Sequence, residues 1–553
     1  MLDYVSQAFT CINALALFLM LAGLGKVLGV RFFYLPKKQA LFPATFMGFG
    51  IAYGLGTLVL SMLYRSTKNF THAWAISLTL LVLYTVVVLS TRPFPKRKDF
   101  AKGEYALVFI ALLVGCLSAV GNLTVWCSAQ FAGMGHSDKY AMFSKLFLWS
   151  DEPVDLSQHY ASTLMTAGVY LLTRWEFETI NWLTHTLLKI GLLCLIYTSA
   201  LEWSRGKKHV AVFTTLAFSL VSGSFSFRLF DYIDSGGPFL MVTYPDRLLG
   251  FYVVFLWIWT LRAVLKRSDK ANMLSPVSFA LVWGAVLAFL AIAAEDLLVL
   301  LSIPIGLTSL WALREVYRRK HSEFWNTFVA SAGVAFGLMY LVTTQGGLLA
   351  NRPQAAGGRE PLKYAAGSGE HQVKIQSSAK FNATPALWYR IYPTERLQVC
   401  HQFINASGWE AFKELAKIAG LGFLAFLLLF AAKRFLPEWE NVLWNPDHLA
   451  FRIMFLWFSV VGVPLALFFN DGVGGETVSR FFQWGLFLSF TMIGYFAAAL
   501  FRRPLVTKIA AVLVLGMASY PMLEFFSRPY MLKHLRQISS IPEKGLVQAV
   551  KNP

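Results

Sequence analysis

A polar run in an otherwise apolar chain is the first place to look for chemistry. It covers residues 135–160, GHSDKYAMFSKLFLWSDEPVDLSQHY, and carries four acids, two histidines and two lysines. Packing between membrane-length apolar segments does not require so many ionisable groups, so the run indicates a functional site. Asp138 is its first candidate, as a catalytic carboxylate or as a metal ligand.

The residues that follow Asp138 predict a short helix lying at the membrane interface, with its N-terminus near Asp138. Its apolar positions recur at helical spacing: Tyr140, Phe143, Leu146 and Phe147. Capping of this helix by Ser137 or Asp138 is the structural alternative to a chemical role, and the two do not exclude each other. His159 and Tyr160 then begin a second short amphipathic segment, near 160–173.

Two further polar groups lie where apolar segments begin or end. Tyr244-Pro245-Asp246-Arg247 precedes one apolar segment, and Ala294-Glu295-Asp296 separates two others. Carboxylates so close to a membrane segment either line a water-filled cavity or mark the membrane boundary. For Arg247 the structural alternative is an ion pair with Asp246 or contact with lipid head groups.

The composition indicates an integral membrane protein. Hydrophobic residues make up 56% of the chain and charged residues only 14%, and the mean hydropathy is +0.54; these values exclude a soluble globule of this length. We therefore expect an all-α polytopic fold with about fourteen transmembrane helices. The apolar segments are 8–29, 41–63, 72–91, 105–125, 181–201, 210–227, 248–265, 275–293, 297–313, 324–343, 412–432, 451–469, 480–500 and 506–525.

Basic residues predict the orientation of these helices. Short loops rich in Lys and Arg, such as 92–102 and 204–209, are expected on the cytoplasmic side, so the acidic loop 122–160 faces outward. These loops and contact with anionic lipid explain the net charge of +19, and no nucleic-acid partner is expected. A multi-pass protein of the bacterial inner membrane is favoured, with the ER membrane as the alternative.

The chain is expected to divide into five parts. They are N-terminal helices at 1–104, a core at 105–343 that includes the acidic loop, an outward loop or small appendage at 344–411, C-terminal helices at 412–525 and an outward basic tail at 526–553.

The order of features resembles the GT-C superfamily, multi-spanning glycosyltransferases that take sugars from polyprenyl-phosphate donors. In that family the first outward loop carries an essential acid, and an aromatic element follows some twenty residues later. Ser137-Asp138-x-Tyr140 and His159-Tyr160-Ala161-Ser162 occupy these places here, without the prolines of the family's second element. The Asp246 and Glu295 groups fit the same layout, although Ala294 replaces a basic residue. The likeness covers roughly residues 105–320.

The resemblance implies a GT-C-like core and transfer of a sugar to a glycan, lipid or protein acceptor on the non-cytoplasmic face. Asp138 would be the general base, assisted by His159 or by a divalent cation, Mg²⁺ or Mn²⁺, that Asp138 and another acid would hold. Arginines would bind the donor phosphate. The candidates are Arg228 and Arg247 first, then Arg480 and Arg390. The other substrate-binding candidates are Tyr160, Asp246, Glu295 and Asp296.

Three other functions remain open from the sequence. A polymerase or ligase that joins lipid-linked glycans would share the outward acids and arginines. A flippase-type transporter would need ionisable groups inside the helices, and here these are few: His185, Lys189 and Lys26. A non-catalytic scaffold subunit of a membrane complex is the third alternative.

Overall fold

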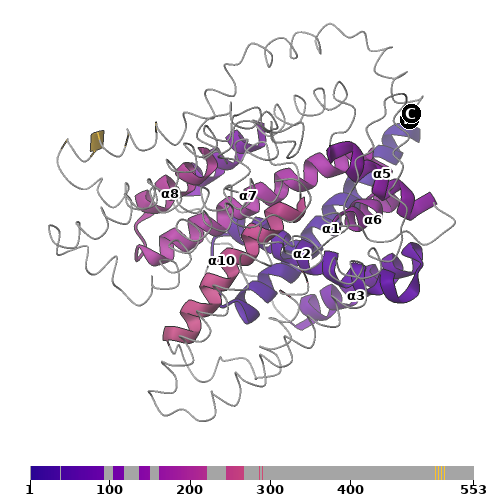
Figure 1. Cartoon of the computed structure of the whole chain (residues 1–553), viewed down its shortest axis with the longest axis horizontal. Coiled ribbons are helices and arrows are strands. Elements are labelled where there is room, and N and C mark those ends of the chain that lie inside the picture. Colours follow the sequence, from indigo (N-terminus) through magenta and orange to yellow (C-terminus); the bar gives the residue numbers. More distant parts are fainter. Residues whose placement is uncertain are drawn as a thin grey trace, which may run out of the picture.

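The computed structural model describes residues 2–37, 39–91, 104–116, 136–149, 161–220 and 245–266, and single positions further along the chain. This part is helical and holds no strand. The helices are α1 (Leu2–Phe32), α2 (Leu41–Thr67), α3 (Phe70–Thr91), the helix Glu104–Cys116, α5 (His136–Trp149), α6 (Thr163–Thr173), α7 (Phe177–Trp203), α8 (Lys208–Leu220) and α10 (Pro245–Lys266). Figure 1 shows α5 and α6 near one end of α7.

Four helices of the described part are long and apolar enough to cross a membrane. They are Gln7–Phe32, Leu41–Thr67, Phe70–Val87 and Thr179–Trp203. Helices α1 and α3 leave large apolar side chains exposed along one face, such as Leu15, Leu19, Leu80 and Leu83. Such stripes are typical of surfaces that face lipid. The protein is therefore an all-helical membrane protein in its described part. Seven of the fourteen predicted spans, from 275–293 onward, lie outside the described residues apart from single positions.

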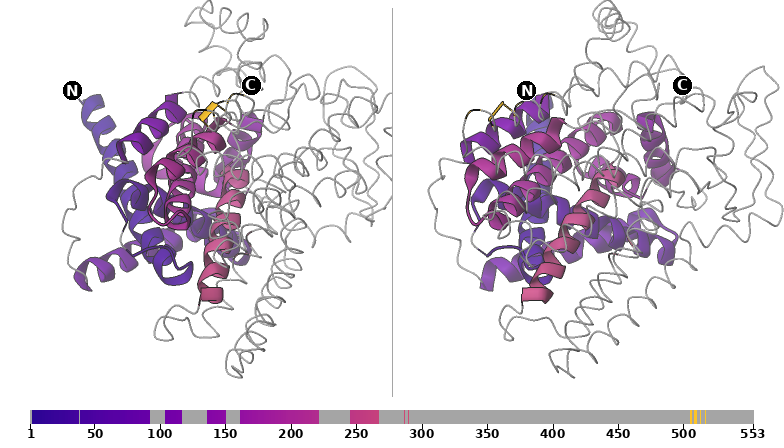
Figure 2. Two further views of the ribbon diagram at one scale, coloured as in Figure 1. Left: turned by 90° about the vertical axis from the view of Figure 1, so that its left-hand side faces the viewer. Right: turned by 60° about the vertical axis from the view of Figure 1, so that its left-hand side comes forward.

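Helices α2 and α7 form the centre of the bundle. Helix α1 packs along α2, and α7 contacts α2, α8 and α10. The two turned views in Figure 2 show α10 beside the N-terminal helices. Small residues allow the backbones to approach closely, because a Cβ at Gly25 would overlap the carbonyl group of Gly48 on the facing helix. Close contact at small residues is a common way to pack membrane helices, where burial of apolar surface adds little.

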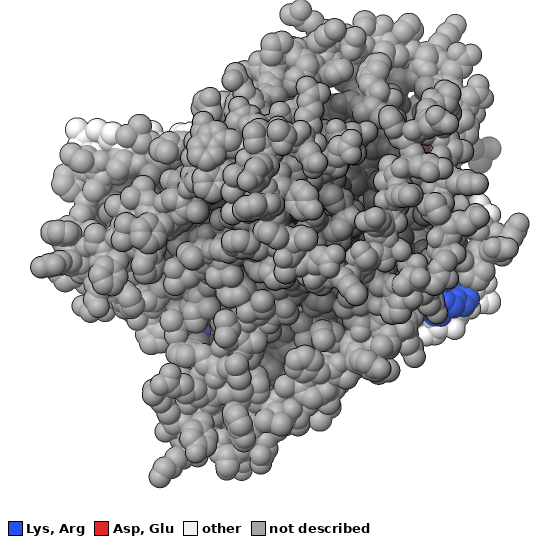
Figure 3. Space-filling model, viewed as in Figure 1, with Lys and Arg blue, Asp and Glu red and all other residues white. Residues whose placement is uncertain are grey.

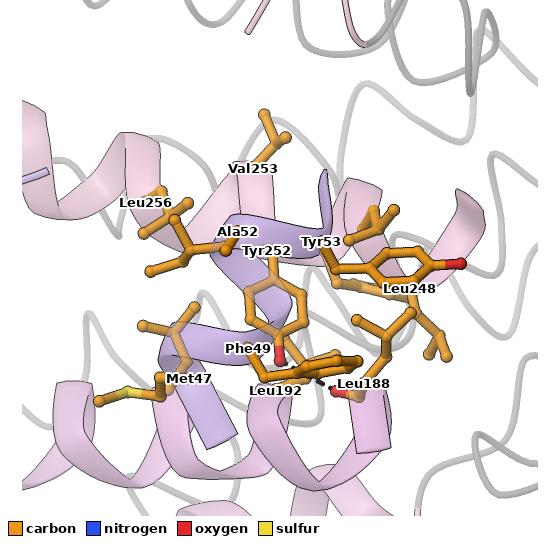
Figure 4. Packing of buried hydrophobic residues seen from close by; sticks show 14 of the residues in the cluster. Met47, Phe49, Ala52, Tyr53, Leu188, Leu192, Leu248, Tyr252, Val253 and Leu256 are labelled. Carbon is orange, nitrogen blue, oxygen red and sulfur yellow. Dashed lines mark hydrogen bonds between the residues drawn. The ribbon is translucent and has the colours of Figure 1, made fainter. Parts of the chain in front are cut away.

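Tyr252 of α10 ties the central helices together. Its ring lies where α2 and α7 carry glycines, and a Cβ at Gly50 or Gly191 would overlap it. Its hydroxyl donates a hydrogen bond to the carbonyl oxygen of Leu188 at 3.1 Å (Figure 4). Farther along the same two helices, Trp259 Nε1 donates to Ser199 Oγ at 2.7 Å. Helices α7 and α10 therefore lie side by side and run in the same direction.

Helix α6 is too short to cross a membrane. Its 11 residues span about 16 Å, roughly half the thickness of a hydrocarbon core. It ends at Thr173, where Arg174 adopts the left-handed conformation (φ 58°) and its N–H bonds to the Tyr170 carbonyl oxygen. The turn into α7 is held by the stacked rings of Tyr170 and Phe177, whose centroids lie 4.5 Å apart. The start of α6 therefore lies well inside the bundle.

Candidate functional site

A buried contact between Asp246 and Ser162 joins two of the motifs found in the sequence. Ser162 ends the His159-Tyr160-Ala161-Ser162 element, and Asp246 belongs to Tyr244-Pro245-Asp246-Arg247. Asp246 accepts hydrogen bonds from the Ser162 amide at 3.2 Å and from the Ser162 hydroxyl at 2.6 Å. Ser162 is fully buried, and Asp246 is 2% exposed. The two elements are 84 residues apart in the chain and meet at one point.

This contact caps α6 from outside the helix. Ser162 lies at the N-cap position, but its own side chain makes no cap hydrogen bond. The carboxylate of Asp246 instead satisfies the Ser162 amide and lies at the positive end of the α6 dipole. Pro245, the first residue of α10, suits the first turn of a helix because it lacks the N–H that would have no partner there. The start of α10 therefore holds the start of α6 inside the bundle.

Tyr53 of α2 adds a third element to the contact. Its hydroxyl donates to the Ser162 carbonyl oxygen at 3.5 Å, a long hydrogen bond, and Asp246, Thr166 and Thr184 lie around it. Figure 4 shows the Tyr53 ring directed away from Tyr252, with its hydroxyl at the edge of the apolar cluster. The group formed by Tyr53, Ser162 and Asp246, here called the capping cluster, thus joins α2, α6 and α10.

The helix that carries Asp138 also contacts the start of α6. Helix α5 begins at His136, so Asp138 is its third residue; the sequence predicted a short helix at this place. Ser144, two turns further along α5, is buried and donates to the Thr163 carbonyl oxygen at 3.2 Å. Phe147 packs edge-on against Tyr64 of α2. Helix α5 is therefore fixed against α2 and the start of α6.

The predicted site residues fall into two groups. Asp246 lies in the capping cluster, Arg247 beside it on α10 is 9% exposed, and the backbone of Asp138 lies in the first turn of α5. The other predicted residues lie outside the described residues: His159, Tyr160, Arg228, Glu295, Asp296, Arg390 and Arg480. The roles predicted for Asp138 as the general base and for Arg228 or Arg247 at the donor phosphate thus stay predictions.

Tyr53 was missed by sequence analysis. It sits in the middle of an apolar segment, where a tyrosine commonly fills space, and its sequence neighbours are apolar or glycine. Its partners lie more than 100 residues away in the chain, so no local pattern identifies them. Thr57 and Ser61 follow it at helical spacing and bond to the carbonyls one turn back. The run of hydroxyls at 53, 57 and 61 was the available signal.

An apolar groove of about 330 Å³ reaches the capping cluster. It lies between α1, α2, α6 and α7, and Tyr53 and Thr184 form part of its wall. Another part of the wall is Leu15, which is 58% exposed, so the groove opens on the outer surface of the bundle. An apolar chain lying in the groove would thus run from the lipid-facing surface to a polar group.

The described residues show no centre of charge that would hold a metal. Among them, no three His, Cys, Asp or Glu side chains gather as a metal site would require. On the face seen in Figure 3, the visible Lys and Arg side chains of the described part are few and lie at the edges. The chain matches no protein-family model, no curated protein and no solved structure. Its function must therefore be argued from the residues themselves.

Proposed function

We propose that this protein is a membrane glycosyltransferase that moves a sugar from a polyprenyl-phosphate donor to a glycan, lipid or protein acceptor at the non-cytoplasmic face. The observation that carries the proposal is the meeting of three segments at the start of α6. Helix α5, which carries Asp138, is hydrogen-bonded to Thr163, and the preceding residue, Ser162, is hydrogen-bonded to Asp246. The GT-C resemblance singled out the same three segments.

The lipid part of such a donor fits the groove beside this point. A polyprenyl chain is apolar, and it would lie among Phe18, Leu21 and Leu187, which are groove-lining side chains. The open side toward the lipid-facing surface would let the chain enter from the bilayer, because the described side chains Ala14, Leu15 and Phe18 on that wall are apolar. The polar head of the donor would then stand near the turns of α6 and α7 that bear the buried polar side chains.

The reaction needs a base and a stabilised leaving group. The acceptor hydroxyl oxygen forms a bond to the anomeric carbon of the sugar, and the bond from that carbon to the phosphate oxygen breaks. The hydroxyl proton passes to Asp138, and polyprenyl phosphate leaves with the bonding electron pair. Arg247 follows Asp246 in one of the three converging segments, and a guanidinium matches phosphate oxygens well.

The test is transfer by the purified full-length protein in liposomes. The donors are hexoses and pentoses, each labelled and carried on the same polyprenyl phosphate, and release of polyprenyl phosphate is measured. We expect one donor to be consumed and Asp138→Asn to lower kcat by at least a hundredfold, as removal of a general base does.

Glu176→Gln is the matched control, because Glu176 is an exposed carboxylate before the start of α7. It should leave the rate unchanged. If the protein consumes no donor, or if Asp138→Asn transfers as fast as the unaltered protein, the proposal fails. In the second case a scaffold role would take precedence.

A further inference from the structure

The first turns of α7 carry a buried polar face inside a membrane-spanning helix. Asn181, His185 and Lys189 follow one another at four-residue intervals, and Trp182 and Thr186 lie next to them. At 3.6 residues per turn these five side chains cover about 140° of the helix surface. All lie within the span Thr179–Trp203. We call this set the α7 polar face.

The α7 polar face is buried, yet several of its atoms lack partners. His185 and Lys189 are fully buried, and Asn181 and Thr186 are 3% and 7% exposed. Four of its side chains have buried polar atoms with no hydrogen bond. These atoms are Asn181 Oδ1, Trp182 Nε1, both ring nitrogens of His185 and Thr186 Oγ1.

Such a group of orphaned atoms is unusual within one pair of turns. Buried polar groups in proteins are nearly always hydrogen-bonded, and leaving one without a partner costs on the order of 1–3 kcal/mol. In a membrane interior no bulk water is at hand to replace the partner. Farther along α7, by contrast, the Ser199 hydroxyl donates to the Leu195 carbonyl oxygen and accepts from Trp259 Nε1. The orphaned atoms therefore indicate a site that something polar fills.

The atom types define what would fill it. Trp182 Nε1 can only donate a hydrogen bond, and Asn181 Oδ1 can only accept one. The Thr186 hydroxyl and the His185 ring can each donate one hydrogen bond and accept another. Lys189 adds a buried positive charge one turn beyond His185, which favours an anionic ligand. A ligand that offers acceptor oxygens with negative charge and also hydroxyl donors meets all of these needs. A phosphate that carries a sugar is such a ligand.

We propose that the α7 polar face binds the sugar-phosphate head group of the lipid-linked donor, with Lys189 and His185 at the phosphate and Asn181 at a sugar hydroxyl. This inference rests on the proposed function and identifies which residues hold its substrate. It adds a lysine and a histidine within the bundle to the arginines that the sequence favoured for binding the phosphate. The apolar groove meets the same turns of α7 on the opposite side of the helix, through Thr184 and Leu187.

The test measures binding to the full-length protein in lipid nanodiscs. The probes are farnesyl phosphate, farnesol and free hexose 1-phosphate, and affinity is measured by native mass spectrometry or thermal shift. We expect farnesyl phosphate to bind at least tenfold more tightly than farnesol. Lys189→Met and His185→Leu should each remove most of that preference, while Lys189→Arg should retain it because the charge remains.

Two matched variants control for loss of a charge or an imidazole. Lys207→Met and His72→Leu change exposed residues at the ends of the helices, and both should bind like the unaltered protein. Helix content and a single size-exclusion peak check folding of every variant. Competition by hexose 1-phosphate would support a head-group site that needs no lipid tail. The proposal would be overturned if farnesol, but not hexose 1-phosphate, displaced farnesyl phosphate. It would also be overturned if Lys189→Met and His185→Leu both kept the preference for farnesyl phosphate over farnesol.

The outcome is separable from that of the proposed function. Asp138→Asn should bind farnesyl phosphate normally although its kcat for transfer is at least a hundredfold lower, whereas Lys189→Met should raise the KM for the donor. If the unaltered protein transfers no sugar but its phosphate preference depends on Lys189, the transferase proposal fails and the binding site stands. If transfer occurs and Lys189→Met leaves KM unchanged, only the binding site fails.

Discussion

The capping cluster and the α7 polar face are both buried polar groups in one helical bundle, but they differ in how their atoms are satisfied. In the capping cluster the Asp246 carboxylate accepts two hydrogen bonds from Ser162. On the α7 polar face, five buried atoms of four side chains have no bonded partner. The capping cluster and the α7 polar face both lie near the first turns of α7. Thr184 contacts Tyr53 of the capping cluster, and the next residue along α7 is His185.

The difference separates structure from function. A satisfied buried network stabilises the fold that it joins, whereas an unsatisfied one costs stability and persists only where something else requires it. We therefore assign the capping cluster to the positioning of α6 and the α7 polar face to ligand binding. Substitutions in the two regions should change stability in opposite directions.

The largest effect is expected from Asp246→Ala. The change leaves the buried amide and hydroxyl of Ser162 without partners and removes the negative charge from the α6 N-terminus. Loss of hydrogen bonds to a charged group should lower the free energy of unfolding by about 3 kcal/mol. Unfolding by SDS titration in mixed micelles measures it, with Glu176→Ala as the exposed-carboxylate control. A loss no larger than that of the control would contradict the structural role of Asp246.

His185→Leu should act in the opposite direction. Two ring nitrogens without partners are replaced by an apolar side chain, so the free energy of unfolding should rise by about 2 kcal/mol. The same titration measures it, together with the loss of farnesyl phosphate preference. A destabilised variant would mean that the imidazole does have a structural partner, and the comparison between the two regions would then break down.

Tyr252→Phe measures how much one buried hydrogen bond in the same core contributes to the free energy of unfolding. The substitution removes the hydroxyl that donates to the Leu188 carbonyl oxygen and keeps the ring between the glycines of α2 and α7. We expect a loss of about 1 kcal/mol, the usual net value of one hydrogen bond. The binding of farnesyl phosphate should not change. A change in binding would show that the two regions are coupled through α10.

The smallest effect is expected at the other end of α7 and α10. Glu202 accepts a hydrogen bond from Arg262 at 3.3 Å, but its side chain is 47% exposed. Glu202→Gln should lower stability by about 0.5 kcal/mol or less, because partly exposed ion pairs are weak. The loss should shrink further as salt concentration rises. A loss as large as that of Tyr252→Phe would imply that this end of the bundle is less accessible to solvent than its exposure indicates.

The sequence alone predicted the helices of the described part with useful accuracy. The predicted segments 41–63, 72–91, 181–201 and 248–265 correspond to α2, α3, α7 and α10. The two short helices around the acidic loop were also predicted, near Asp138 and near 160–173. The reason is that a membrane helix bonds its own backbone and shows its length and periodicity in local composition. Of the predicted segments beyond 293, the structure describes only single positions in 506–525.

The site was predicted only in pieces. Asp246 and Ser162 each appeared in a motif, and His185 and Lys189 stood out as ionisable groups within an apolar segment. The contact between Asp246 and Ser162 could not be predicted, because a hydrogen bond between residues 84 positions apart leaves no pattern in either segment. Likewise the sequence could not tell that Ser199 would be bonded and His185 would not, since both are single polar residues on the same helix.

The sequence by itself thus determined that this is a helical membrane protein and where several of its helices begin and end. The tertiary structure alone decided which buried polar atoms have partners and which do not. The physical reason is that helix formation depends on contacts within a few residues, whereas satisfaction of a side-chain atom depends on the depth and rotation at which separate helices pack. Close backbone contacts, such as that of Gly25 with Gly48, determine both the depth and the rotation of this packing.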